Sequence, residues 1–255
     1  MGRANADAAV VVLTPAESRR LIARAVAALP QVRRAMANAL IIIGNGTTNA
    51  YVAEELLGIA LPKIPFAAGL IRNGALDSTD DATRLKPIVI ERGKQVDVAY
   101  QEALGEFGGE DVFIKGANAV DPRGRAGVLM GSDIGGTIGA CLALVTARGS
   151  HLIMPVGLEK LVPDVVAASR ACGIHRLSQA MGHKVGLMPV ATGRVITEVQ
   201  AFEILGGVRA THVASGGVDG SEGSVVLALE GEPAAVEAAF GLAQAVKGEP
   251  PVTEG

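Results

Sequence analysis

The chain has 255 residues, of which 49% are apolar and 19% charged, so it can bury a sizeable core and is globular rather than disordered. Its formal net charge is −3, with acidic and basic residues mixed along the chain. This excludes a basic nucleic-acid-binding face and gives no support for attachment to a membrane surface. The longest apolar runs are too short for a membrane span. We therefore expect a cytoplasmic protein with neither nucleic-acid nor membrane partners.

The predicted elements alternate between strands and helices. Residues 1–13 are expected to form a loose leader. The first helix opens at residue 14, where Thr14 fits the N-cap, Pro15 the first helical position and Glu17 the reciprocal capping position. Further strands are expected at 39–43, 63–71, 86–91, 111–115, 127–130 and 152–156. Further helices are expected at 49–57, 97–107, 137–147 and 158–171.

This order predicts an α/β fold with a mostly parallel, Rossmann-like sheet and helices on both faces. The pattern changes near residues 173–183. The later elements are expected to be a strand at 185–190, a helix at 194–205, a hairpin at 208–214 and 224–229, and a final helix at 233–247. That β-α-β-β-α order predicts a small C-terminal α+β module resembling the ferredoxin-like sandwich. We therefore expect two domains, residues 1–182 and 183–255.

A glycine-rich turn follows the expected strand at 39–43 and opens the next helix. Its residues are Gly44, Asn45, Gly46, Thr47 and Thr48. Backbone N–H groups and the helix dipole converge at such a point, glycines let an anion approach, and threonines add hydroxyl donors. The turn therefore predicts an anion site, and the alternative is a plain tight turn with a capping residue.

A second and a third segment occupy similar positions at the carboxyl ends of strands, where ligands of open α/β sheets bind. In the second, Lys115 is a candidate catalytic residue that can neutralise an anion or donate to a developing enolate oxygen, and Asn118 can orient oxygens. Asp121 either moves a proton or only shapes the turn before Pro122. In the third, Asp133 is the candidate general base, with helix capping as the alternative. The glycine turn beside it supplies further candidate ligand-binding residues, namely Gly135, Gly136 and Thr137.

These three segments resemble the superfamily that contains ribose-5-phosphate isomerase A, glucosamine-6-phosphate deaminase and the coenzyme A transferases. The similarity rests on strand–Gly-Asn-Gly-Thr-Thr–helix, then Phe-Ile-Lys-Gly-Ala-Asn-Ala-Val-Asp-Pro, then a Gly-Gly turn, over roughly residues 14–170. The resemblance implies the fold and a sugar-phosphate site at the first turn. In the isomerase the second segment carries acidic residues, and the third carries a lysine beside glycines.

The chain departs from that pattern at the residues that carry the chemistry. Lys115 and Asn118 stand where the isomerase has aspartates, Ala119 replaces its glutamate, and no lysine accompanies the Gly-Gly turn. Of the acidic run only Asp121 remains. The coenzyme A transferases have a catalytic glutamate near a glycine-rich turn, and here Asp133 is the faint counterpart. The resemblance therefore does not carry over ribose-phosphate isomerisation.

The four histidines are neither paired at i,i+4 nor grouped with cysteines, so no metal and no cofactor is expected. The leading hypothesis is a homo-oligomeric protein that binds a small anionic, sugar-phosphate-like metabolite and catalyses proton-transfer isomerisation. The alternatives are a non-catalytic metabolite sensor and an acyl-transferring enzyme of the coenzyme A transferase kind.

Overall fold

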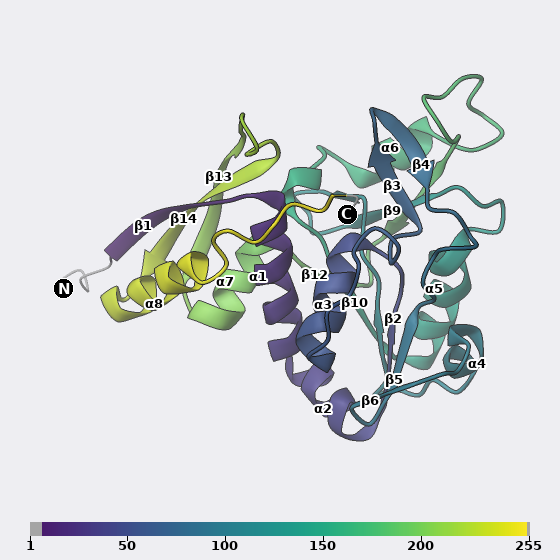
Figure 1. Ribbon diagram of the computed structural model, residues 1–255, viewed down its shortest axis with the longest axis horizontal. Helices are drawn as coiled ribbons and strands as arrows, with labels where there is room; N and C mark the ends of the chain where they lie inside the picture. The colour runs from purple at the N-terminus through teal and green to yellow at the C-terminus, as the bar shows by residue number, and fades with distance from the viewer. Residues whose placement is uncertain (1–6, 254–255) are drawn as a thin grey trace.

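The computed structural model describes residues 7–253, which form a mixed α/β structure with four β-sheets (Figure 1). The strands are β1 (Asp7–Leu13), β2 (Leu40–Ile43), β3 (Gly69–Arg72), β4 (Ala75–Ser78), β5 (Ile88–Glu91), β6 (Lys94–Val96), β7 (Val112–Ile114), β8 (Ala119–Val120), β9 (Ala126–Met130), β10 (His151–Pro155), β11 (Gly186–Val190), β12 (Arg194–Ile196), β13 (Arg209–Gly216) and β14 (Ser224–Gly231). The helices are α1 (Pro15–Ala28), α2 (Pro30–Asn38), α3 (Thr47–Leu57), α4 (Tyr100–Gly105), α5 (Gly136–Arg148), α6 (Val165–Ala171), α7 (Glu198–Gly206) and α8 (Pro233–Gln244), with one 3-10 turn, η1 (Leu158–Lys160).

The largest sheet has six strands in the order β12-β10-β7-β2-β5-β6. Strands β12, β10, β7 and β2 are parallel, whereas β5 and β6 continue the sheet antiparallel. The prediction of an α/β fold with a mostly parallel sheet is therefore confirmed. All side chains of the runs 41–43 and 112–114 are buried, which is expected of strands covered on both faces.

Helices cover both faces of this sheet, with α1 and α3 on one side and α4 and α5 on the other (Figure 1). Helix α1 begins as the sequence predicts. The Thr14 hydroxyl accepts a hydrogen bond from the Glu17 amide at 3.4 Å, and the Glu17 carboxylate accepts one from the Thr14 amide at 2.9 Å. This reciprocal pair satisfies two amides that a helix start leaves without partners.

The N-terminal residues that were expected to form a leader form a strand instead. Strand β1 pairs antiparallel with β14 over its full length, and residues 1–6 lie outside the described range. Side-chain burial alternates along this strand, as a sheet with one face on the core requires: Val11 and Leu13 face the core, while Val10 and Val12 are exposed.

Three other predicted elements are partly wrong. The strand predicted at 63–71 exists only from Gly69 onward, because Pro65 interrupts the run and lacks the N–H that a ladder needs. The helix predicted at 158–171 is divided at Pro163 into η1 and α6, and Asp164 caps α6. The helix predicted at 194–205 begins only after Thr197, since residues 194–196 form β12 beside β10.

The C-terminal elements also depart from the expected β-α-β-β-α module. Strand β11, expected as its first strand, pairs with β9 in the separate sheet β11-β9-β8. Strand β1 joins the β13–β14 hairpin instead and gives the sheet β1-β14-β13, with α7 and α8 beside it (Figure 1). Elements on each side of residue 182 therefore share sheets, through β1–β14, β9–β11 and β10–β12.

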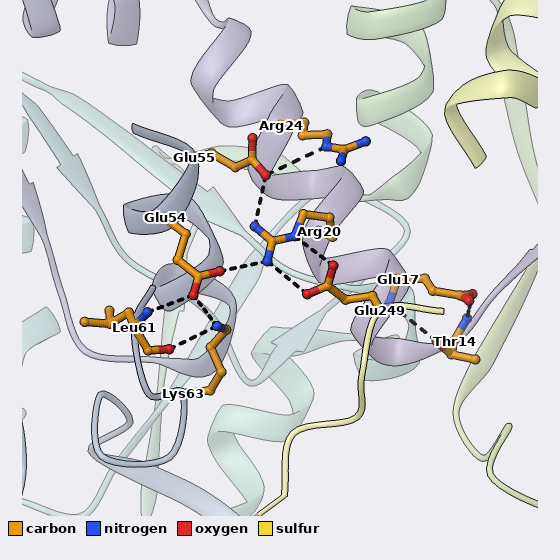
Figure 2. A network of polar contacts seen from close by, with 9 residues as sticks. All are labelled: Thr14, Glu17, Arg20, Arg24, Glu54, Glu55, Leu61, Lys63 and Glu249. Carbon is orange, nitrogen blue, oxygen red and sulfur yellow. Dashed lines mark hydrogen bonds and ion pairs between the residues drawn. The ribbon is translucent and has the colours of Figure 1, made fainter. Parts of the chain in front are cut away.

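A polar network ties helices α1 and α3 to the C-terminal segment (Figure 2). The Arg20 guanidinium lies 2.7 Å from Glu54, 2.9 Å from Glu55 and 2.9 Å from Glu249, measured between nitrogen and carboxylate oxygen. The Arg20 side chain is 15% exposed, and its guanidinium carbon lies 4.7 Å from the centre of the Tyr51 ring. One cation thus contacts three carboxylates from two distant parts of the chain, and Lys63 and Arg24 add positive charge beside Glu54 and Glu55 (Figure 2).

Replacement of Arg20 by methionine is expected to lower the free energy of unfolding by about 2 kcal/mol, because three crowded carboxylates lose their shared cation. Urea denaturation measures this change. The matched control is Arg34→Met, because the Arg34–Glu110 pair is 58% and 75% exposed and its loss is expected to cost under about 0.5 kcal/mol. Equal effects of the two substitutions would contradict a stabilising role for the network.

Candidate functional site

The candidate site is a cavity of about 400 Å³ beyond the carboxyl ends of β2 and β7. Its volume lies within the range of roughly 300–1,000 Å³ that is usual for small-molecule sites. It is bounded by the turn after β2, the segment after β7, the turn before α5 and the β3–β4 hairpin. Residues that line it include Asn45, Gly46, Thr47, Thr48, Asp77, Arg84, Lys115, Asn118, Gly135, Gly136, Thr137, Lys160 and His183.

The start of α3 forms one wall. Gly46 is its N-cap residue, with φ of +156°, a value that favours glycine, and no side chain caps the helix. The amides of Gly44 and Gly46 donate to the carbonyls of Ile114 and Phe66. Within residues 7–253 the amides of Thr47 and Thr48 have no acceptor, and both residues line the cavity, so these amides can bind an anion.

The side chains of two asparagines shape this turn. The Asn45 amide donates to the carbonyls of Phe66 and Leu85, at 3.1 and 2.8 Å, and so ties the turn to the α3–β3 and β4–β5 connections. Asn49 is fully buried and donates to the Gly44 carbonyl at 2.6 Å. Its Oδ1 atom has no partner in the described chain and lies beside Gly116. The turn is thus held by side-chain hydrogen bonds to backbone carbonyls, which do not involve the first amides of α3.

The start of α5 forms a second wall of the same kind. Its N-cap residue is Gly135, with φ of +80°, followed by Gly136 with φ of +56°, and again no side chain caps the helix. The Gly135 amide donates to the Ser132 carbonyl at 2.9 Å. Two glycine-capped helices, of eleven and thirteen residues, therefore begin at one cavity. Their dipoles both favour negative charge there.

The second predicted segment contributes Lys115 and Asn118 to the cavity wall. Lys115 follows β7, and its backbone amide donates to the Ile153 carbonyl of β10 at 2.9 Å. Asn118 is exposed, and its side-chain oxygen accepts from the Leu129 amide at 3.0 Å. The turn after β2 and the segment of Lys115 meet because β2 and β7 are adjacent parallel strands. The turn before α5 follows β9, which belongs to the separate antiparallel sheet β11-β9-β8 and not to the parallel sheet as predicted, yet this turn lines the same cavity.

The two predicted carboxylate bases do not line this cavity. Asp121 is buried and is bound by Arg125 at 2.7 Å, by the Val165 amide at 3.0 Å and by two further backbone amides. These donors, led by Arg125, outweigh the desolvation that burial brings and lower the pKa of Asp121 to about 2. Asp133 is 68% exposed in a neighbouring surface hollow and lies 3.1 Å from His175.

Three basic residues of the wall were missed by the sequence analysis. Lys160 comes from η1, just beyond β10, and its position after a parallel strand was the available signal. Arg84 and His183 come from irregular segments, and no sequence pattern marks them. The one carboxylate among the described lining residues, Asp77, is paired with Arg72.

The electrostatics of the cavity favour an anion. Burial, together with the positive charge of Lys160, lowers the pKa of Lys115 to about 8. Burial also lowers the pKa of Lys160, although Glu159 lies 3.8 Å away. Both shifts show that burial disfavours the positive forms of these lysines, and a bound anion would supply the counter-charge that Lys115 lacks among the described residues.

No family model matches this chain, and comparisons with curated proteins and with solved structures give no match. Within the described part of the chain, no group of three or more His, Cys, Asp or Glu side chains is placed to hold a metal ion. Among the same residues, no helix combines the length and apolar character needed to cross a bilayer.

Anion affinity is expected to fall as the pH rises through 8, because Lys115 loses its charge there. Sulfate is a suitable probe, since its own charge is constant over this range. Between pH 7 and pH 9.5 its dissociation constant is expected to rise roughly tenfold, the value of one charge-assisted hydrogen bond. Isothermal titration calorimetry measures this change. The Lys115→Met variant should bind weakly and show little change between pH 7 and 9, and an equally steep profile in that variant would contradict the role of Lys115.

A buried carboxylate lies behind the cavity. Glu198, the first residue of α7, is fully buried and accepts from the Leu158 amide at 2.9 Å. Burial, assisted by the charge of Glu159, raises the pKa of Glu198 to about 7. The folded protein therefore holds this proton more tightly than the unfolded chain, so this group makes stability decrease as the pH rises from about 4.5 to about 7.

The Glu198→Gln variant removes this ionisation and keeps an oxygen that can accept from the Leu158 amide. We expect it to be more stable than the wild type at pH 8, by on the order of 2 kcal/mol, and nearly equal to it at pH 4.5. Urea denaturation at the two pH values tests this. Glu203→Gln, at an exposed position of the same helix, should leave the pH dependence unchanged. A gain that is the same at both pH values would show that ionisation is not its cause.

Proposed function

We propose that this protein binds a small phosphorylated, sugar-phosphate-like metabolite in the cavity beyond β2 and β7. The observation that carries the proposal is the convergence of two uncapped helix starts with Lys115 and Lys160 on one space. A phosphate group accepts several hydrogen bonds and carries negative charge, which matches free amides, threonine hydroxyls and ammonium groups. The remaining polar wall suits hydroxyl groups of a sugar.

The family assignment is part of the same proposal. We infer a divergent member of the superfamily of ribose-5-phosphate isomerase A, glucosamine-6-phosphate deaminase and the coenzyme A transferases, because the segments that carry the resemblance meet at this cavity. We also infer that the six-stranded sheet is Rossmann-like and that the C-terminal helices and hairpin are a ferredoxin-like variant completed by β1. A cytoplasmic homo-oligomer, assembled through the exposed edge of β13, completes this hypothesis.

A non-catalytic metabolite sensor is the second candidate, and one observation favours it. Proton-transfer isomerisation needs a base near the substrate carbon, and neither Asp121 nor Asp133 lines the cavity. Asp77 is engaged with Arg72. Binding without turnover is therefore the simpler use of the site, whereas catalysis would require that Lys115 or the ligand itself move the proton.

Thermal-shift measurements with inorganic phosphate, ribose 5-phosphate, free ribose and acetyl-coenzyme A test the proposed ligand class. We expect stabilisation by ribose 5-phosphate and by phosphate, and none by ribose. Replacement of Lys160 by methionine should weaken ribose 5-phosphate binding about tenfold, because one ammonium contact is lost.

Lys94→Met is the matched control, because Lys94 is exposed on β6 and does not line the cavity. It should bind ribose 5-phosphate as the wild type does. Equal stabilisation by ribose and ribose 5-phosphate would contradict phosphate recognition, and stabilisation by acetyl-coenzyme A alone would favour acyl transfer. Exchange of solvent deuterium into bound ribose 5-phosphate would separate an isomerase from a sensor.

A further inference from the structure

Lys115 differs from an ordinary surface lysine because no acidic side chain pairs with it in the described part of the chain. Its Nζ atom has one recorded polar contact, the Gly116 carbonyl at 3.4 Å, which is a weak hydrogen bond. Across residues 7–253, no carboxylate lies within ion-pair distance of Lys115. The other lysine of the cavity wall, Lys160, contacts both Glu159 and the Ala117 carbonyl. The amine of Lys115 is therefore the less engaged of the two.

The stem of Lys115 is held in place by the sheet. Its backbone is bonded to β10, and its Cδ atom passes 3.3 Å from the point where a side chain on Gly44 would begin. A side chain at position 44 would therefore require the lysine stem to shift by a few tenths of an ångström. The amine is thus positioned by a central strand and by the glycine turn that opens α3, rather than by a mobile loop.

Positive groups surround this amine. Lys160 lies close enough to repel its charge, and the starts of α3 and α5 add the positive ends of two helix dipoles. The nearby thiol of Cys141 is buried and stays neutral, because burial raises the pKa of Cys141 to about 11. With a lysine pKa of about 8, roughly one amine in ten is neutral at pH 7. A neutral amine in a desolvated pocket beside another cation is a nucleophile.

We propose that Lys115 forms an imine with the carbonyl carbon of an aldehyde or ketone phosphate held in this cavity. The inference rests on the proposed phosphate site and narrows its ligand to carbonyl compounds. The neutral Nζ attacks the carbonyl carbon, the π electrons move to oxygen, and a proton passes from nitrogen to that oxygen to give a carbinolamine. A second proton on the hydroxyl then lets water leave, and the nitrogen lone pair forms the C=N bond.

Imine formation would compensate for the absence of Asp121 and Asp133 from the cavity wall. A protonated imine withdraws electrons from the neighbouring carbon and makes its C–H bond more acidic, so a weaker base suffices for proton transfer. The phosphate remains at the helix starts throughout. No oxidant, metal or further reactant is needed, and one water is released for each imine formed.

The test is reductive trapping with dihydroxyacetone phosphate and sodium borohydride on the full-length protein. We expect one adduct per chain, with a mass gain equal to the probe less one oxygen atom, and peptide mapping should place it on Lys115. Its rate of formation should rise between pH 6.5 and pH 8, opposite to the pH profile for sulfate binding, because the neutral amine is the reactant.

Two variants distinguish the role of the Lys115 charge in anion binding from the role of its amine in imine formation. Lys115→Arg keeps the positive charge and cannot form an imine, so it should still bind glycerol 3-phosphate and lose the adduct. Lys94→Arg, at the exposed position on β6, should trap the probe as the wild type does. Circular dichroism and the melting temperature establish that each variant is folded.

The outcomes are distinguishable. If glycerol 3-phosphate stabilises the protein but no adduct forms on Lys115, or adducts are spread equally over exposed lysines, the imine is wrong and the phosphate site stands. If neither glycerol 3-phosphate nor inorganic phosphate stabilises the protein, the proposed function fails and the imine fails with it. An adduct on Lys115 alone, absent from Lys115→Arg, supports the proposal.

Discussion

The first amides of α3 and α5 are the constraint on which the cavity depends. Each helix begins at a glycine, so no side chain is present at the N-cap to accept from them. The contrast with α1 and α7 is direct, because Thr14 and Thr197 close those helix starts with reciprocal caps. Uncapped amides need water or a ligand, and here two sets face one space. The six-stranded sheet places α3 and Lys115 there, since α3 follows β2 and the segment of Lys115 follows the adjacent parallel strand β7. Helix α5 follows β9 of the separate antiparallel sheet.

The scaffold around this cavity is held by charges that are satisfied elsewhere. Arg20 gathers Glu54, Glu55 and Glu249, and Arg125 gathers Asp121 and Asp164. Neither set of carboxylates lines the cavity. Among the cations of the cavity wall, Lys160 contacts Glu159 and Arg84 contacts Asp81. Lys115 has no carboxylate partner among residues 7–253, so it is the cavity cation that a bound anion would neutralise.

Local sequence patterns predicted the structural features that depend on neighbouring residues, namely helix caps, buried strands and glycine turns. The capping box of α1, the buried parallel strands and both glycine turns follow from residue types within a few positions of each other. The rule for parallel sheets then brings the first turn beside Lys115, whereas the second turn reaches the cavity from the separate sheet that contains β9. The approach of Arg84 and His183 to the cavity depends on how irregular segments fold back, which no periodicity encodes. Strand β1 was missed because its partner, β14, lies more than two hundred residues away.

Asp121 and Asp133 show that residue type and loop position alone do not identify a catalytic base. Both were candidates for a base because they lie in loops that follow predicted strands. A base must also reach the ligand, and neither residue lines the cavity. Arg125, four residues after Asp121, was the visible signal that this carboxylate has a structural partner. Lys115 is the reverse case, since the sequence indicated an anion-neutralising and candidate catalytic lysine, but its pKa of about 8 comes from burial that the sequence does not display. When protonated, an amine with that pKa attracts a phosphate, and when neutral it attacks a carbonyl carbon. One side chain can therefore support both ligand binding and imine formation, in a cavity whose described lining residues include no carboxylate free of an ion pair.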